Sequence, residues 1–287
     1  MSGTGLRVVV GVDDTDDSLT ALDAAAAEAA LRRQPLHVIH ADPFATAADT
    51  ATGPLPEEPG RWATRAMARA SAAHPGLTVT GEVARGFPQP VLVAASRDAG
   101  LVVIGDRGLG ALSRAMTETV AGGLTLRAAC PVLVTCGPGT PNGAIAVGVD
   151  GSPYSEAALG FAFAEAQLRG RRVTLVHAWS RPGPHKPGAV LPIDFDAMSV
   201  RAGAERMVSE ISAGWREKYP DVKVRSLVVH GHPREALTEV GQAVSLFVVG
   251  TRGRTVPQVP QLGSVSRHLL YHAPCPVVIV PREWAER

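Results

Sequence analysis

The chain has 287 residues, of which 45% are hydrophobic and 19% are charged, and its formal net charge is +1. This length suits two hydrophobic cores better than one, and the balanced charge argues against nucleic acid or an anionic membrane as the main partner. Aromatic residues make up only 5%, which disfavours a base-stacking surface. The amino terminus lacks a signal-peptide pattern, and no apolar run approaches the roughly 20 residues of a membrane span, so we expect a cytoplasmic protein.

The first half alternates short apolar runs with helix-forming runs. Residues 8–12 and 36–41 lack polar alternation, which is typical of strands buried on both faces. Residues 18–33 between them are rich in alanine and leucine and predict a helix. Further elements are expected as follows: a helix at 61–73, a strand at 77–83, a short helix at 90–98, a strand at 101–105, and a last helix followed by the closing strand at 130–135.

The same order of elements returns in the second half. The expected strands are 145–149, 173–178, 224–230, 246–250 and 275–280, and the expected helices are 155–169, 196–219 and 234–243. His40 and His177 lie 137 residues apart, whereas Gly105 and Gly250 lie 145 apart, so the second copy contains about eight inserted residues. Alternating strands and helices predict an α/β, Rossmann-like protein of two tandem domains, each a five-stranded parallel sheet with helices on both faces.

A run of turn-forming residues separates the two copies. Residues 137–143 read Gly-Pro-Gly-Thr-Pro-Asn-Gly, which predicts a linker. We therefore expect one domain over 1–138 and a second over 142–287.

The second copy carries a spaced glycine motif. Gly250 and Gly253 follow its fourth strand, nine residues intervene, and Gly263, Ser264 and Val265 open a helical stretch. Glycine lets the backbone turn and lets a phosphate approach it, and a helix amino terminus offers N–H groups and a positive dipole end to an anion. Because ligands of open α/β sheets bind beyond the carboxyl ends of strands, the motif predicts a phosphate site. Asp150, after the first strand of this half, supplies a carboxylate for a base or ribose.

This Gly-x2-Gly-x9-Gly-Ser spacing, the opening VGVDGSPYSEAAL, the segment VHGHPREAL and the closing CPVVIV resemble the universal stress protein family. Its ATP-binding members carry the motif, and the resemblance covers nearly the whole chain, once per half. It implies an adenine nucleotide alpha hydrolase-like fold, ATP as ligand and a stress-response role. By this resemblance, Asp150 and Ala178 border the adenine and ribose, and the motif residues line the phosphates. Ala178 stands where the family often has valine.

The first copy departs from the motif. Its corresponding positions form a weaker candidate site, namely Asp13, Ala41, Gly105, Gly108 and Thr119. Glu118 takes the place of Gly263, which brings a side chain, and when ionised a repelling charge, toward the phosphates. Four carboxylates at 13–17 are also unfavourable there unless Mg²⁺ offsets them. We expect the first half to bind nucleotide weakly or not at all.

Other conspicuous residues have simpler interpretations. The aspartates at 13–17 lack the ligand spacing of a calcium loop and suit a solvated helix start. His40 and His177 suit packing at strand ends better than proton transfer. Cys130 and Cys275 suit buried apolar positions, and three cysteines predict neither a disulfide framework nor a metal site.

Three functions remain open on the sequence. The first is an ATP-binding regulatory protein and not an enzyme, since the motif lacks a Walker-type lysine and no nucleophile motif is found. The second is a slow ATPase or a nucleotidyl- or phosphoryl-transfer enzyme, and the third is a nucleotide-free interaction scaffold. By the family resemblance, strands 131–135 and 276–280 would pair within one chain as an internal pseudo-dimer, which protects two sheet edges. Association of two chains as a homodimer stays open.

Overall fold

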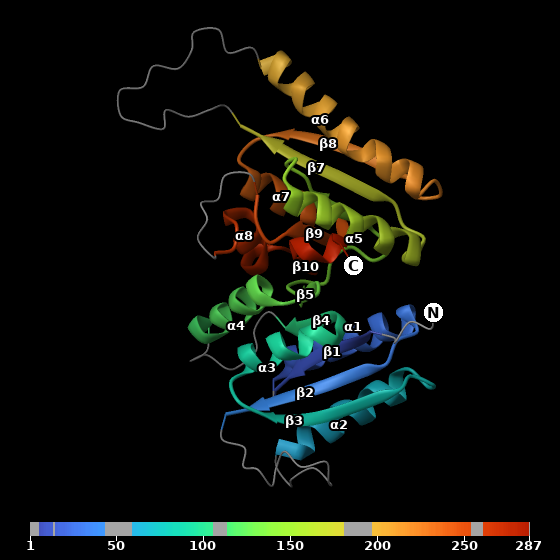
Figure 1. Cartoon of the computed structure of the whole chain (residues 1–287), viewed down its shortest axis with the longest axis vertical. Helices are drawn as coiled ribbons and strands as arrows, with labels where there is room; N and C mark the ends of the chain where they lie inside the picture. The colour runs from blue at the N-terminus through green and yellow to red at the C-terminus, as the bar shows by residue number, and fades with distance from the viewer. Residues whose placement is uncertain are drawn as a thin grey trace.

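The computed structural model describes residues 6–13, 15–43, 59–105, 114–180, 197–253 and 261–286. They form one sheet of ten strands with helices on both faces (Figure 1). Residues 106–113, which include the predicted site residue Gly108, lie outside the described ranges.

The first half has the expected order of elements. They are β1 (Arg7–Val12), α1 (Asp16–Arg32), β2 (Leu36–Asp42), α2 (Pro59–Ala73), β3 (Val79–Arg85), α3 (Pro88–Ala95), η1 (Ser96–Asp98), β4 (Ala99–Gly105), α4 (Arg114–Arg127) and β5 (Val132–Thr135). The second half repeats the order of strands and α-helices, has no 3-10 turn in the described residues just before its fourth strand, and adds a 3-10 turn at its end. Its elements are β6 (Ala144–Gly148), α5 (Pro153–Arg169), β7 (Val173–Trp179), α6 (Ala197–Lys218), β8 (Val224–His230), α7 (Pro233–Gly241), β9 (Val244–Gly250), α8 (Ser264–His272), β10 (Val277–Val280) and η2 (Arg282–Glu286).

The strand order across the sheet is β3-β2-β1-β4-β5-β10-β9-β6-β7-β8. Within each half all neighbouring strands are parallel, as predicted. At the centre, β5 and β10 pair antiparallel, with Val278 opposite Leu133. The predicted pairing of the two final strands within one chain is confirmed, and it joins two five-stranded sheets into one.

The two long helices that follow β1 and β6 begin earlier than expected. The sequence placed serines 18 and 155 at the helix starts, but Thr15 and Ser152 are the N-caps. The Ser152 hydroxyl accepts a hydrogen bond from the Ser155 backbone N–H at 3.2 Å, and Thr15 does the same for Ser18 at 3.3 Å. Each cap satisfies an N–H that has no partner within the helix.

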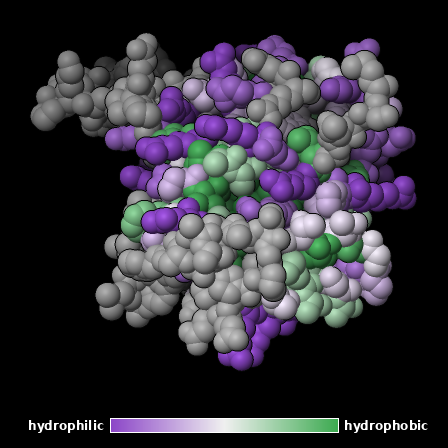
Figure 2. All heavy atoms as spheres, turned by 60° about the horizontal axis from the view of Figure 1, so that its bottom comes forward, coloured by the Kyte–Doolittle hydropathy of each residue, from purple (hydrophilic) through white to green (hydrophobic). Residues whose placement is uncertain are grey.

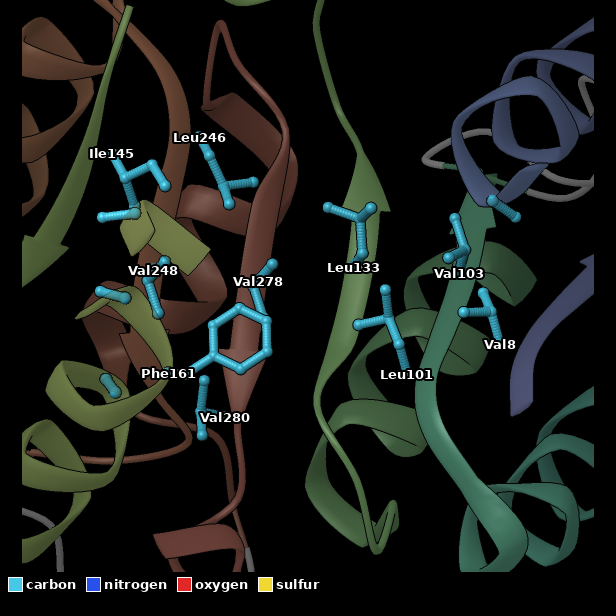
Figure 3. Packing of buried hydrophobic residues seen from close by; sticks show 14 of the residues in the cluster. Val8, Leu101, Val103, Leu133, Ile145, Phe161, Leu246, Val248, Val278 and Val280 are labelled. Carbon is cyan, nitrogen blue, oxygen red and sulfur yellow. The ribbon is translucent and has the colours of Figure 1, made fainter. Parts of the chain in front are cut away.

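Two hydrophobic cores lie on opposite faces of the sheet, and each extends through both halves. One packs beneath α1, α2, α5 and α6, and the other beneath α3, α4, α7 and α8. Figure 3 shows the first core at the junction of the halves, where Leu133 of β5 and Val278 of β10 lie on adjacent strands and Phe161 of α5 packs nearby. Burial of these side chains stabilises the halves against each other as well as within themselves.

The exposed residues of α2 include Arg61, Thr64, Arg65 and Arg69. Figure 2 shows this end of the molecule, where hydrophilic side chains surround smaller hydrophobic areas. Among the described helices, none is both long enough and apolar enough to cross a membrane.

Candidate functional site

A cleft of about 360 Å³ opens beyond the carboxyl ends of β6, β7 and β9, which is the position where open α/β sheets bind ligands. It falls within the volume range of small-molecule sites. The structure brings all seven residues singled out in the second half to its lining: Asp150, Ala178, Gly250, Gly253, Gly263, Ser264 and Val265. Valines 149, 176 and 249, with Leu237, give the cleft an apolar part.

The amino terminus of α8 forms one wall of the cleft. Gly263 is its N-cap and has no side chain to accept a hydrogen bond from the first turn. The backbone N–H of Gly263 donates to the Thr251 carbonyl at 2.9 Å, and the buried Ser266 hydroxyl donates to the Gly250 carbonyl at 2.7 Å. These bonds fix the start of α8 against the end of β9, so the wall presents uncapped N–H groups and the positive end of the helix dipole.

Two of the motif glycines have a packing role that the sequence did not indicate. A Cβ on Gly250 would collide with the carbonyl oxygen of Tyr154, in the first turn of α5. A Cβ on Gly253 would lie 2.6 Å from Oδ2 of Asp150. Glycine at position 250 therefore allows the start of α5 to pack closely, and glycine at position 253 leaves room for the Asp150 side chain.

The Asp150 carboxylate is oriented by its own loop. Its Oδ1 accepts a hydrogen bond from the Ser152 N–H at 3.0 Å, and its Oδ2 faces Gly253. The His177 ring nitrogen Nδ1 lies 2.7 Å from the carbonyl oxygen of Val149. Because a carbonyl only accepts, Nδ1 carries the proton in this bond. His177 thus ties the end of β7 to the residue before Asp150.

The matching histidine of the first half makes the same bond. His40 Nδ1 donates to the Val12 carbonyl at 3.0 Å. The sequence interpretation placed both histidines in packing at strand ends, and the hydrogen bonds add a positioning role for the loops after β1 and β6.

Residues outside the seven singled out form two further parts of the cleft. Arg252 donates from Nε to the Gln261 carbonyl at 3.1 Å, and its guanidinium lies 5.9 Å from the centre of the Tyr154 ring, so it contacts both the end of the motif's intervening segment and the start of α5. His232 and Pro233 also line the cleft, at the point where α7 begins. In the sequence, the segment VHGHPREAL supports only the family resemblance. A proline soon after a strand nevertheless predicts a helix start, and helix starts that follow parallel strands lie at the edge of the sheet where ligands bind.

The first-half positions are only partly described. Asp13 follows β1, and its Oδ1 accepts from the Thr15 N–H at 3.0 Å and from the Thr15 hydroxyl at 2.5 Å. Ala41 lies in β2 and Gly105 ends β4. Thr119 lies in α4, but its side chain and that of Glu118 are outside the described part. Among the residues that the structure describes, no group of three or more histidines, cysteines or acidic residues could hold a metal ion.

The cysteines lie away from the cleft lining. Cys130 and Cys275 are buried, as expected. Burial raises the pKa of the Cys275 thiol to about 12, so at neutral pH it stays protonated and unreactive.

The sequence of this chain matches a known family over nearly its whole length. The model of the universal stress protein family matches residues 6–135 and again 142–281. This chain belongs to the universal stress protein family. Universal stress protein Rv2005c of Mycobacterium tuberculosis is 38% identical over 292 residues, covering 95% of this chain and 96% of the relative. Universal stress protein Rv2623 of the same organism is 33% identical over 296 residues, covering 96% of each.

Solved structures share the tandem architecture at much lower identity. A putative universal stress protein from Pseudomonas aeruginosa has a TM-score of 0.65 and 16% identity, covering 98% of both chains. A universal stress protein from Archaeoglobus fulgidus has a TM-score of 0.61 and 14% identity, covering 96% of both. These likenesses establish the fold.

Proposed function

We propose that this universal stress protein binds ATP in the second-half cleft and acts as a nucleotide-dependent regulatory protein. The observation that carries the proposal is the convergence of the glycine motif, the uncapped start of α8 and the Asp150 carboxylate on one cleft. The α8 terminus suits phosphates, because uncapped N–H groups and the helix dipole both favour an anion. Asp150 and Ala178, about the apolar part of the cleft, suit a ribose and base.

We further propose that the chain comprises domains 1–138 and 142–287, with nucleotide held mainly by the second. A regulatory rather than catalytic role is supported by the motif, which has no lysine to hold the β- and γ-phosphates. Bound ATP would then act by favouring one conformation or assembly, which requires different affinities for the two states. In cells this links the protein to stress signalling.

Calorimetric titration with ATP and Mg²⁺ tests the site when the affinity of the wild type is compared with that of the Gly263→Glu variant. This substitution gives the second half the residue that the first half has at position 118, and it sets a carboxylate at the start of α8. Repulsion of the phosphates should weaken binding at least ten-fold, about 1.4 kcal/mol. Gly203→Glu in α6, which adds the same charge away from the cleft, should bind like the wild type.

Two further readouts separate the alternatives. Mass spectrometry of small molecules released from the purified, denatured protein should detect adenine nucleotide, and no release together with no titratable binding would favour a nucleotide-free scaffold. Chromatography of ATP and ADP over hours tests for an enzyme. Turnover orders of magnitude above that of Gly263→Glu would contradict the regulatory assignment.

A further inference from the structure

Four charged side chains meet where α1 of the first half approaches α5 of the second. Arg32 Nη2 lies 2.5 Å from Glu165 in the other half and 3.0 Å from Glu28 in its own helix. Arg169 Nη2 lies 2.5 Å from Glu28 in the other half and 2.8 Å from Glu165 in its own helix. Each arginine thus binds both carboxylates. We call these four residues the ionic quartet.

The quartet follows the internal repeat. Glu28 and Glu165 are 137 residues apart, and so are Arg32 and Arg169. Each half contributes a glutamate and, one helical turn later, an arginine. When two such helices meet in antiparallel fashion across the β5–β10 junction, the glutamate of each reaches the arginine of the other. The surface is therefore complementary to a second copy of itself.

The quartet is largely removed from water. The exposed fractions are 3% for the Glu165 side chain, 10% for Glu28, 14% for Arg32 and 25% for Arg169. Burial alone would lower the pKa of Arg169, yet the carboxylates of Glu28 and Glu165 outweigh it and raise the pKa. Buried charges are tolerated when every partner is in place and strongly destabilise when one is missing.

Strand pairing alone specifies the junction poorly. Only three residue pairs join β5 to β10, and all of them are Val, Leu or Ile, as in Val277 opposite Val134. Because side chains alternate with a period of two, a shift of two residues would keep apolar side chains on the same faces. These three strand pairs therefore do not by themselves select one register.

We propose that the ionic quartet is the recognition surface between the two halves, and that it selects how β5 and β10 pair. Any other arrangement loses the Arg32–Glu165 and Arg169–Glu28 contacts and leaves each buried charge with only the partner in its own helix, which disfavours that arrangement. The partner that this surface fits is a second half with glutamate and arginine at the same helical spacing. This inference is independent of nucleotide binding.

Charge exchange in the full chain tests the quartet. The double variant E165R/R169E keeps a pair of opposite charges within α5 but places like charges against Arg32 and Glu28. Thermal unfolding, followed by circular dichroism and calorimetry, should lose its single cooperative transition, and the first midpoint should fall by about 10 °C. The fourfold variant E28R/R32E/E165R/R169E restores opposite charges across the junction, and it should return the single transition to within about 3 °C of the wild type.

A matched control uses an ion pair inside one half. Asp23 of α1 and Arg69 of α2 are about half exposed, 48% and 49%, so D23R/R69D should leave the transition unchanged. The proposal is overturned when E165R/R169E unfolds like the wild type. It is equally overturned when the fourfold variant is as damaged as the double variant, including the case in which neither folds.

Discussion

Individual glycines in the second half are constrained by packing. Gly250 touches the carbonyl of Tyr154, and Gly148 has Leu237 and Val249 within 3.1 Å of where a Cβ would stand. Tyr154 opens the helix beneath the cleft. The end of β9, the start of α5 and the cleft wall are therefore coupled through one backbone contact, and a side chain there would displace all three.

A Gly250→Ala substitution should destabilise the protein by about 1–3 kcal/mol, because backbone atoms of α5 must move to admit a methyl group. Gly214→Ala is the matched control. Its Cβ would meet no atom within 4 Å on the exposed side of α6, so alanine should stabilise by about 0.5–1 kcal/mol. Urea unfolding midpoints measure both, and equal effects of the two substitutions would contradict the packing argument.

At the level of the element, the two halves offer an internal comparison of helix ends. The C-cap residue is Arg33 for α1 and Gly170 for α5, and both residues adopt the left-handed conformation, with φ of 54° and 60°. In each case the backbone N–H returns to carbonyls of the last helical turn. Glycine adopts this conformation without steric cost, whereas arginine adopts it only at a steric cost.

Arg33→Gly should therefore stabilise the protein by about 0.5–1 kcal/mol, since the relief of strain exceeds the added entropy of the unfolded chain. That corresponds to a rise in Tm of roughly 1–3 °C. The reciprocal Gly170→Arg should lower Tm by a similar amount. A fall in Tm for Arg33→Gly would show that the exposed arginine makes compensating contacts.

Across the whole molecule, stability should depend on pH through a buried histidine of the first half. His37 of β2 lies 2.8 Å from the Thr80 hydroxyl through Nδ1 and 3.4 Å from Glu82 through Nε2. Burial, helped by the charge of Arg7, lowers the pKa of His37 below 6.5, although Glu82 acts in the opposite direction. The unfolded chain therefore takes up this proton at higher pH than the folded protein does.

Stability should consequently be highest above the ordinary histidine pKa and fall as the pH drops below about 6.5. His37→Gln should flatten this part of the profile, because the buried site then has no group to protonate. Tm measured between about pH 7.5 and about pH 5.5 checks the prediction. An unchanged slope in the variant would assign the acid sensitivity to other groups.

The sequence was enough to predict the architecture, because the repeat, the β-branched runs and the turn-rich linker all indicate the same α/β fold. It also predicted which residues gather at the second-half cleft, since strand ends in a parallel sheet share one edge. The ionic quartet could not be predicted. Glu165 and Arg169 are four residues apart and read as an ordinary exposed helix pair. Only the packing of the two halves shows that Glu165 also contacts Arg32 and that Arg169 also contacts Glu28.

The role of Gly250 was hidden for the same reason. Its spacing in the motif indicates a ligand, whereas its contact with α5 depends on how a distant helix packs. Local sequence patterns predict local geometry. Contacts between elements far apart in the sequence can be identified only from the three-dimensional structure.

The antiparallel junction of β5 and β10 also brings α4 and α8 together on one face of the sheet (Figure 1). The Tyr271 hydroxyl of α8 lies 3.5 Å from where a Cβ on Gly122 of α4 would stand, and the Cys136 thiol donates to the Leu270 carbonyl at 3.3 Å. In a dimer of identical subunits, every substitution is imposed on both of these helices at once. Duplication within one chain removes that constraint, because α4 can change in sequence while α8 keeps the glycine at its start. Two related helices can then differ in function although they lie in equivalent positions.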